Sequence, residues 1–283
     1  MGLTEGPAEE IGLQLKYQQA VRSAAARLNR RQRWEDLAIR VAAVAVILLL
    51  WELGARQMNP LLFVPPSRIA QAAVYVVGSG ELWKYLSISL KAFVIGVSGG
   101  TVAGIVVGVA LARFRPLDLS LEPFMIALYS TPTVALIPLM MIWFGTGEKA
   151  KSVVIFLFAL FPILLNTYQG VKSVDSRLLE VARSFRSTER ALWLDVIIPA
   201  SLPFIVAGMR LGIGRALVGM VISDLLLAVT GIGYLIVKYQ MLFQVDRMFV
   251  PVVTLSLLGI TLVQVLRWLE TKVAPWQQHG RDE

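Results

Sequence analysis

Six long apolar runs, separated by short polar stretches, dominate this chain of 283 residues. A helix needs about 20 apolar residues to cross the hydrocarbon core of a bilayer, and each run has or approaches that length. The runs lack the apolar–polar alternation of membrane β-strands, so they are expected to be helices. The sequence therefore predicts an all-α integral membrane protein with six transmembrane helices, at residues 37–55, 86–112, 124–144, 152–170, 206–229 and 248–269.

The composition agrees with a membrane protein and argues against several kinds of chemistry. Hydrophobic residues make up 56% of the chain and charged residues 16%, whereas soluble domains contain roughly 25% charged residues. The chain has no cysteine, and its one histidine is His279. Disulfides, thiol catalysis and histidine-based metal or triad sites are therefore not expected.

The segment GTGEKAKS at 145–152 matches a phosphate-binding loop only in part. That loop requires G-x-x-x-x-G-K-[ST] between a strand and a helix, and here Glu148 follows Gly147 where a lysine is needed. The sequence carries no other nucleotide-binding or nucleophile motif. We therefore expect no enzyme activity and no cofactor or metal on this chain, so that any ATP hydrolysis belongs to another subunit.

The positive charges are distributed unevenly between the two sides of the six runs. If the N-terminus is cytoplasmic, 17 lysines and arginines fall in the inner segments and 7 in the outer segments, as the positive-inside rule predicts. This bias accounts for most of the net charge of +8 without nucleic-acid binding. Two short interfacial helices are expected on the outer side, at 64–77 and 231–243. The predicted organisation has a cytoplasmic tail at 1–36, a transmembrane domain at 37–270 with a cytoplasmic loop at 171–199, and a cytoplasmic tail at 271–283.

The second run carries glycines at every fourth position, which form a ridge without side chains on one side of a helix. Such a ridge allows two membrane helices to approach closely. The ridge could serve packing within one subunit, or it could lie at a moving interface or between subunits. The ridge residues are Gly96, Gly100, Gly104 and Gly108.

Polar groups lie at membrane depth in the third, fourth and fifth runs. Pro132, Pro138 and Pro162 remove backbone donors and predict local unwinding. Polar side chains at this depth usually face a bundle interior or an aqueous path, and an arginine there would suit an anionic solute. The alternative is that the hydroxyls satisfy freed carbonyls and that each charge pairs with a neighbouring helix. The candidate path residues are Ser130, Thr131, Pro132, Thr133, Asn166, Arg215 and Asp224.

The connection between the fourth and fifth runs is unusually charged. Its segment EVARSFRSTERALWLDVIIP contains three arginines and three acidic residues. Ser176 is predicted to cap a helix on which Glu180 and Arg183 share one face. Pro199 and Pro203 are predicted to end the helical structure before the fifth span. A charged face with aromatic residues is suited to docking another protein.

The same loop resembles the signature of the permease subunits of bacterial ABC importers. That signature is E-A-A, then a glycine, then a proline further along, and Glu180, Val181, Ala182 and Pro199 match it here. Arg186 stands where the family has glycine, which leaves open whether the usual tight turn forms. The segments STPTVALIPLMMIWFG, FPILLNTYQGV, EVARS and GIGYLI are similar to the nitrate/sulfonate/taurine/bicarbonate branch of this family, over roughly residues 40–270.

The resemblance implies a permease subunit of an ATP-driven importer in the bacterial inner membrane. The family fold is a core of five spans, here with one leading N-terminal helix, and a second permease copy would complete a homodimer around the path. Two cytoplasmic ATPases, which bind ATP and Mg, would dock on residues 177–193. An extracytoplasmic binding protein would deliver a small anion such as nitrate, a sulfonate or bicarbonate. The residues implied in ATPase coupling are Glu180, Val181, Ala182, Arg183, Phe185, Arg186 and Pro199.

A channel or a secondary transporter with a cytoplasmic regulatory loop is the alternative from a different class. A channel needs a selectivity filter, and many secondary transporters have inverted repeats with interrupted helices in both halves. The glycine ridge and the charged loop each occur once in this sequence, so neither pattern is evident. A membrane enzyme is a third possibility, for which the sequence offers no catalytic constellation.

Overall fold

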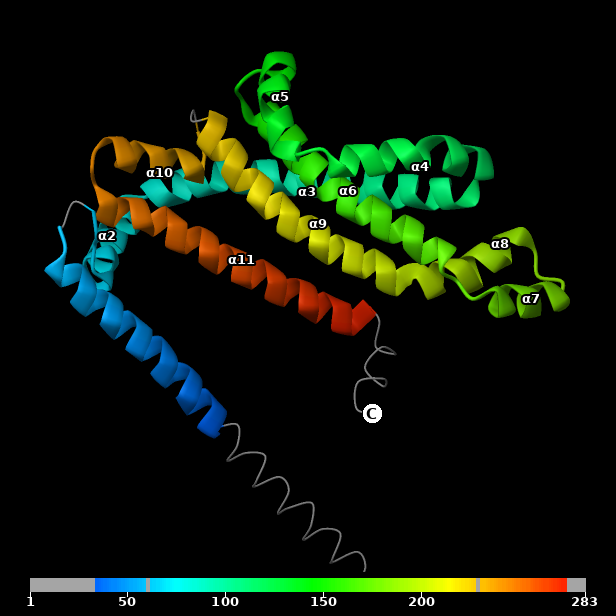
Figure 1. Cartoon of the computed structure of the whole chain (residues 1–283), viewed down its shortest axis with the longest axis horizontal. Coiled ribbons are helices and arrows are strands. Elements are labelled where there is room, and N and C mark those ends of the chain that lie inside the picture. Colours follow the sequence, from blue (N-terminus) through cyan, green and yellow to red (C-terminus); the bar gives the residue numbers. More distant parts are fainter. Residues whose placement is uncertain (1–33, 60–61, 228–229, 274–283) are drawn as a thin grey trace, which may run out of the picture. The chain divides into compact units, whose positions relative to one another are not determined.

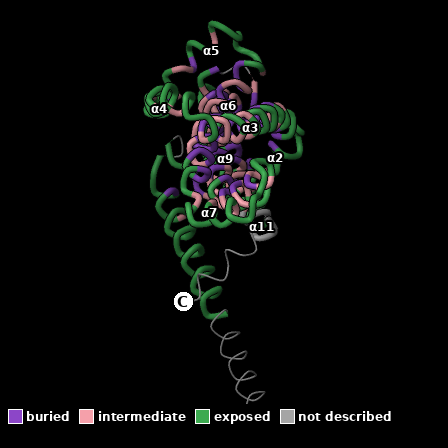
Figure 2. Tube along the Cα trace, turned by 90° about the vertical axis from the view of Figure 1, so that its right-hand side faces the viewer, coloured by how far each residue is buried: buried purple, intermediate pink, exposed green. Residues whose placement is uncertain are grey.

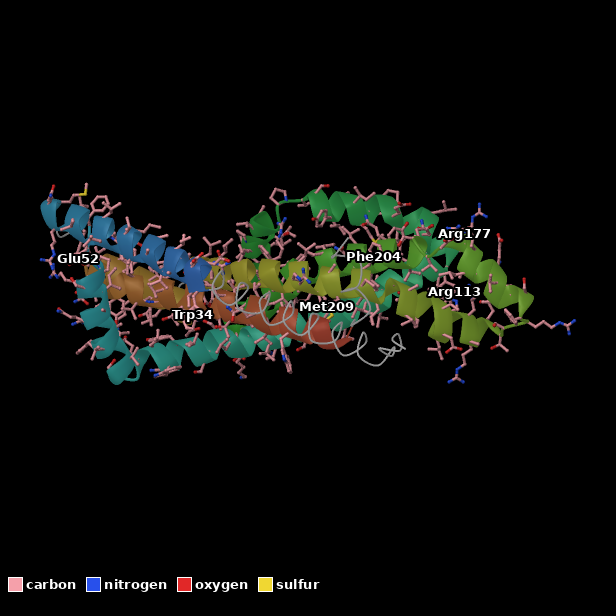
Figure 3. The ribbon with its side chains drawn as sticks, turned by 90° about the horizontal axis from the view of Figure 1, so that it is seen from below. Trp34, Glu52, Arg113, Arg177, Phe204 and Met209 are labelled. Carbon is pink, nitrogen blue, oxygen red and sulfur yellow. The ribbon has the colours of Figure 1, made fainter. Side chains whose placement is uncertain are left out.

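The computed structural model describes residues 34–59, 62–227 and 230–273, and this part of the chain is helical and contains no strand. The chain divides into two compact units, Met1–Ser67 and Arg68–Glu283. The first unit contains the helix Trp34–Gln57, on which Glu52 (Figure 3) pairs with Arg56 at 2.8 Å. Most of the predicted tail at 1–36, and residues 274–283 of the other tail, lie outside the described residues.

Four long helices and several short ones make up the second unit (Figure 1). The long helices are α3 Glu81–Arg113, α6 Glu148–Lys172, α9 Ile198–Leu227 and α11 Val245–Val273. The short helices are α2 Pro66–Gly78, which starts just before the boundary, α4 Arg115–Ser130, α5 Ile137–Phe144, α7 Ser176–Ser184, α8 Glu189–Ala191 and α10 Ile232–Met241. Among the described residues, five helices are long and apolar enough to cross a membrane, and a bent pair supplies a sixth span if it is counted as one. The predicted six-span, all-α fold is confirmed. The helices α2 and α10 lie at the positions of the two predicted short helices.

The bent pair is the third predicted span, which is broken near its middle. The helix α4 ends at Ser130, a 3₁₀ turn follows at Thr133–Leu136, and the two halves meet at 91°. Pro132 lies in the break, where its missing N–H removes the bond that would continue the helix. Pro138 lies in the first turn of α5, where proline is tolerated. Pro162 lies inside α6, which continues past it, so the predicted unwinding is confirmed at Pro132 and wrong at Pro162.

The prediction that Pro199 and Pro203 end the helix before the fifth span is also wrong. Helical structure continues from Glu189 to Leu227. Directly before the first proline, residues Leu192–Ile197 form a π-helical segment. Its wider turn gives room where a proline ring would otherwise meet the carbonyl of the preceding turn. The chain can therefore pass Pro199 without leaving the helix.

The core of the second unit is a close stack of α3, α6 and α9, seen side by side in Figure 1. The glycine ridge of α3 faces α6, because a Cβ atom added at Gly96, Gly100, Gly104 or Gly108 would lie within 3.0 Å of an α6 atom. Several of these α6 atoms are backbone carbonyl oxygens, such as that of Leu164 at 2.8 Å from the added Cβ of Gly108. The ridge therefore serves packing within the chain, the first of the two predicted alternatives.

A second glycine stripe, on α9, packs against another side of α6. A Cβ atom added at Gly208, Gly212 or Gly219 would come within 2.8 Å of an α6 side chain. This stripe was not predicted from the sequence. The helix α6 is held between two glycine-lined neighbours, and its side chains Ile155 and Ile163 are fully buried. Figure 2 shows the buried residues gathered around α6 and α9 and exposed residues along α4.

Candidate functional site

The 171–199 loop begins with a capped helix. The carboxylate of Asp175 pairs with the guanidinium of Arg177 (Figure 3) at 2.8 Å and accepts a 2.9 Å hydrogen bond from that residue's backbone N–H. Because both contacts favour the ionised carboxylate, the pKa of Asp175 is lowered from its usual value. The predicted cap, Ser176, is instead the first residue of α7. Aspartate caps a helix as well as serine does, and here it lies one residue earlier.

One face of α7 packs onto the body of the protein. Leu179 and Ala182 contact a buried cluster formed by Val171, Leu192 and Ile197. These three residues come from the end of α6 and from the π-helical segment. The helix is therefore held against the membrane spans by apolar contacts, in addition to its covalent connections.

The other face of α7 is open. Glu180, Val181, Arg183 and Phe185 are exposed, and the Phe185 side chain reaches 82% exposure. The Ser184 hydroxyl donates a 2.9 Å hydrogen bond to the Glu180 carbonyl oxygen. Glu180, Arg183 and Phe185 thus offer negative charge, positive charge and an aromatic ring to solvent, whereas Ala182, another predicted coupling residue, lies on the packed face.

The turn after α7 is tight although arginine stands at the glycine position. Arg186 has a φ of 54°, in the left-handed region that favours glycine. Its N–H donates to the Arg183 carbonyl at 2.8 Å, and the Ser187 N–H donates to the Ala182 carbonyl at 3.2 Å. These paired bonds form a Schellman motif. The tight turn implied by the resemblance is present, and Arg186 adopts the left-handed backbone conformation that this turn requires.

The end of α3 also holds the loop. The guanidinium of Arg113 lies 3.2 Å from the carboxylate of Glu189 and 5.5 Å from the ring centroid of Trp193. Arg113 and Arg177 lie at the same end of the helical core in Figure 3. The charged and aromatic contacts of Arg113 therefore connect the loop to the same α3 that packs along α6.

Two of the candidate path residues, Asn166 and Arg215, line one pocket of about 190 Å³. The pocket lies between α4, α6 and α9, and its other polar lining residues are Tyr129 and Gln169. The Asn166 side-chain N–H donates a 2.8 Å hydrogen bond to the Pro162 carbonyl oxygen within α6. Tyr129 and Gln169 were not predicted as path residues, although Gln169 follows Asn166 by three residues and so shares its helix face.

A larger cavity of about 760 Å³ lies elsewhere, near the start of α6. It is lined by Ile95, Phe144, Gly147, Glu148, Lys149, Ser152 and Val153. Its lining is mostly apolar, and none of the candidate path residues contributes to it. Of the seven candidate path residues, only Asn166 and Arg215 meet in a pocket, and it is the smaller one.

The candidate path residues at the bend of the third span make different contacts. The Ser130 hydroxyl donates to the Ile126 carbonyl at 2.8 Å, and the Thr131 hydroxyl donates to the Ala127 carbonyl at 2.9 Å. Neither residue lines the 190 Å³ pocket, and nor do Pro132 and Thr133. These hydroxyls satisfy carbonyls of the last turn of α4, which is the structural alternative considered for them.

Asp224 lies away from the pocket, in a buried ion pair. Its Oδ1 atom is 2.6 Å from the Nζ atom of Lys151, and the two side chains are 1% and 0% exposed. The Ser89 hydroxyl also donates to this carboxylate, and Lys151 donates to the Thr230 carbonyl. Asp224 was predicted to line the path, but its geometry is that of the alternative, pairing with a neighbouring helix. Lys151 was assigned to an outer loop, and its burial was not anticipated.

Comparison with known proteins gives a consistent assignment. Residues 100–275 match the family described as "Binding-protein-dependent transport system inner membrane component". SsuC of Bacillus subtilis (strain 168), whose name assigns it to aliphatic sulfonates transport, is 31% identical over 235 residues, which cover 82% of this chain and 85% of the relative. The taurine transport system permease protein TauC of Escherichia coli (strain K12) is 28% identical over 265 residues, which cover 89% of this chain and 95% of the relative.

Another relative carries a different solute in its name. The formylaminopyrimidine transport permease protein ThiX of Halalkalibacterium halodurans is 28% identical over 234 residues, which cover 82% of this chain and 93% of the relative. Among solved structures, an inward-facing form of the MetNI methionine ABC transporter aligns with a TM-score of 0.56 and 19% identity, over 66% of this chain and 93% of that chain. At this identity, the structural likeness supports the fold alone.

Proposed function

This chain belongs to the family of binding-protein-dependent transport system inner membrane components, and it is an ABC importer permease rather than an enzyme. We therefore propose that a separate ATPase drives it through the 171–199 loop. The observation that carries the proposal is the open face of α7. Phe185 is 82% exposed beside the exposed Glu180, while the opposite face of the helix is packed. A partner subunit would cover this aromatic ring and pair with the carboxylate.

The way in which the loop is held favours transmission of force. The apolar contacts of α7 and the contacts of Arg113 hold the loop against the spans, and the cap at Asp175 and the tight turn at Arg186 define the two ends of α7. A rigid connection is needed if movement of an ATPase is to alter the membrane helices. In this proposal, the ATPases bind ATP and Mg. The permease chain takes no part in ATP hydrolysis other than by providing the docking surface for the ATPases.

The solute we propose is a small anion with a sulfonate group. Two relatives that align over most of this chain are named for aliphatic sulfonates and for taurine. Arg215 and Asn166 line one pocket at membrane depth, and an intramembrane arginine suits a negatively charged solute. The name of ThiX shows that the family also contains relatives with other solutes, so the solute test below uses a panel.

The assembly and the orientation complete the proposal. A second copy of the chain would form a homodimer around the path, and an extracytoplasmic binding protein would deliver the solute. The exposed apolar residues of α4, which include Leu119, Phe124 and Leu128, offer a surface for that copy or for lipid. Both termini and the 171–199 loop would be cytoplasmic, as the distribution of lysine and arginine favours.

The test is a complex of the permease with its ATPase and binding protein, reconstituted in vesicles. Glu180→Ala and Phe185→Ala are expected to reduce both the retained ATPase and solute-stimulated ATP hydrolysis, because truncating a buried interfacial charge costs about 2–5 kcal/mol. Phe243→Ala is the matched control, since Phe243 is 74% exposed at the end of α10. Unchanged ATPase retention and hydrolysis in both loop variants would exclude docking on this face. Uptake of taurine, methanesulfonate, nitrate and bicarbonate by the same vesicles identifies the solute.

A further inference from the structure

The pocket between α4, α6 and α9 brings together four polar side chains from three helices. Asn166 and Gln169 lie one turn apart on α6, Arg215 lies on α9 and Tyr129 on α4. Within the residues that the structure describes, the Tyr129 hydroxyl, the Gln169 amide and the Arg215 guanidinium have no hydrogen-bond or ion-pair partner in the protein. Three groups able to donate hydrogen bonds therefore line one small space with their donors unused.

The charge of Arg215 has no counterion in the described part of the chain. Three acidic side chains of the surrounding helices are already paired: Asp224 with Lys151, Glu148 with Lys91 and Asp118 with Lys172. Glu122 lies on α4, seven residues before Tyr129, which is roughly 10 Å along the helix axis. Arg215 is exposed, and a guanidinium at membrane depth is stable only where it meets water or an anion, so this pocket favours a negatively charged occupant over a neutral or cationic one.

The donors suit an oxyanion with more than two oxygens. A guanidinium binds two oxygens of one anion with parallel hydrogen bonds. The Gln169 amide and the Tyr129 hydroxyl can donate to a third oxygen, and so can the second N–H of the Asn166 amide, whose first N–H bonds the Pro162 carbonyl. Leu165 and Leu211 add apolar lining, against which a short alkyl group can pack.

The volume of the pocket gives a scale for the part of an occupant that the pocket can enclose. At about 30 Å³ for each water molecule, a cavity of about 190 Å³ holds roughly six water-sized groups. This is the size of a methanesulfonate or of a two-carbon sulfonate. A larger amphiphile would extend outside the pocket.

We propose that Tyr129, Asn166, Gln169 and Arg215 form a binding site for the head group of a small organic oxyanion, with a sulfonate as the preferred member. The proposal rests on the proposed function, because it places this site on the transport path. Arg215 provides the charge and two hydrogen bonds, and the neutral donors select an oxyanion over a halide. The site lies next to the 91° bend of the third span, so Tyr129 would move if that bend changes.

The first test measures the pocket without requiring transport. The chain has no cysteine, so Leu211→Cys places a single thiol in the lining of the pocket. In the purified permease–ATPase complex, this thiol is expected to react faster with 2-sulfonatoethyl methanethiosulfonate than with its trimethylammonium analogue. Adding Arg215→Gln should lower the ratio of the two rates on the order of tenfold, since a neighbouring unit charge has an effect of this size at a partly solvated site. Arg215→Lys should keep the ratio, and millimolar methanesulfonate should slow the anionic reagent.

Met241→Cys is the control, because Met241 is 74% exposed at the end of α10 and its rates should respond to none of these changes. A rate ratio at Leu211→Cys that is the same with arginine and with glutamine at 215 would overturn the site. If acetate slows the reaction of the thiol with the anionic reagent as much as methanesulfonate does, the preference for sulfonates is wrong, and the site binds carboxylates equally well. Monodisperse elution and retention of the ATPase confirm that each variant is folded.

The second test asks whether the site serves transport. Gln169→Ala and Arg215→Lys are expected to raise the half-saturating sulfonate concentration at least several-fold while the ATPase stays bound. If the thiol reactivity depends on Arg215 as expected but transport is unchanged in these variants, the anion site exists but lies off the transport path. That result would overturn the proposed role of the site in transport. If Glu180→Ala leaves coupling intact while the thiol assay succeeds, the docking proposal fails and the anion site stands.

Discussion

The ammonium nitrogen of Lys151 on α6 lies 2.6 Å from a carboxylate oxygen of Asp224 on α9, with both side chains buried. Burying two charges costs several kcal/mol for each ion unless pairing and further hydrogen bonds offset it. The Ser89 hydroxyl and the Thr230 carbonyl supply such bonds. The backbone N–H of Ile232 then donates to Ser89 at 2.8 Å. One ion pair thereby links α3, α6, α9 and the start of α10.

Removing one member of this pair should destabilise the protein strongly. Lys151→Met or Asp224→Leu would leave an unpaired buried charge, for which the expected loss is about 3–5 kcal/mol. The double variant should recover a large part of this loss. The measurement is the unfolding midpoint of the purified permease, followed by tryptophan fluorescence. The exposed pair of Lys91 and Glu148, 2.9 Å apart, is the control, and its loss should cost about 1 kcal/mol or less.

Adding a side chain to the glycine ridge should separate α3 from α6. A Cβ atom at Gly104 would already lie 3.0 Å from the Ile163 side chain, so Gly104→Leu overpacks the contact and should cost about 1–3 kcal/mol or more. Gly78→Leu has no atom within 4 Å of its added Cβ and should have little effect. Equal losses of purified, monodisperse protein at the two positions would contradict the packing role.

Restoring glycine at position 186 should relieve strain in the turn after α7. A non-glycine residue in the left-handed region costs on the order of 1 kcal/mol, so Arg186→Gly should stabilise the loop and retain or improve coupling to the ATPase. Arg186→Val should do the opposite, because a β-branched side chain tolerates this region least. Limited proteolysis of the loop measures the first effect, and solute-stimulated ATP hydrolysis measures the second. A loss of ATPase binding in Arg186→Gly would mean that the guanidinium itself is a docking contact.

The orientation in the membrane can be tested with single cysteines. Gln71 on α2 and Ser187 after α7 are both exposed, and they lie on opposite sides in the proposed topology. Gln71→Cys should react with an impermeant maleimide in intact cells, and Ser187→Cys should react only after the cells are permeabilised. The reversed result would invert the topology and exclude a cytoplasmic ATPase on the 171–199 loop.

The sequence was sufficient to predict the number and type of the spans, because apolar length is what a bilayer requires of a helix. Both short helices were also predicted, and the structure has helices at those positions. The packing role of Gly104 and its neighbours was one of two alternatives, since a ridge identifies a close contact without identifying the partner helix. The stripe at Gly208, Gly212 and Gly219 was missed, because its spacing is less regular.

The errors concern residues whose environment depends on distant parts of the chain. Lys151 was placed in an outer loop from its position at the start of an apolar run, and its partner Asp224 is 73 residues away. Pro199 was expected to end a helix, but the π-helical segment before it accommodates the ring. Asn166 and Arg215 were both selected as polar residues at membrane depth. That they share a pocket with Tyr129 and Gln169 follows from the packing of α4, α6 and α9, which a single sequence does not specify.

The π-helical segment at Leu192–Ile197 has an evolutionary consequence. A π-turn corresponds to one extra residue in an α-helix, and each residue of an α-helix rotates the chain by about 100°. Deleting one residue there would return the segment to α-helical register and turn α8 and the preceding α7 around the axis of α9. The surface offered to an ATPase would then point in a new direction, and the contacts of Leu192 and Ile197 with Val171 would change, while the packing of α3 against α6 would be kept. Relatives that work with different ATPases could therefore diverge by a single insertion or deletion at this position, without redesign of the transmembrane core.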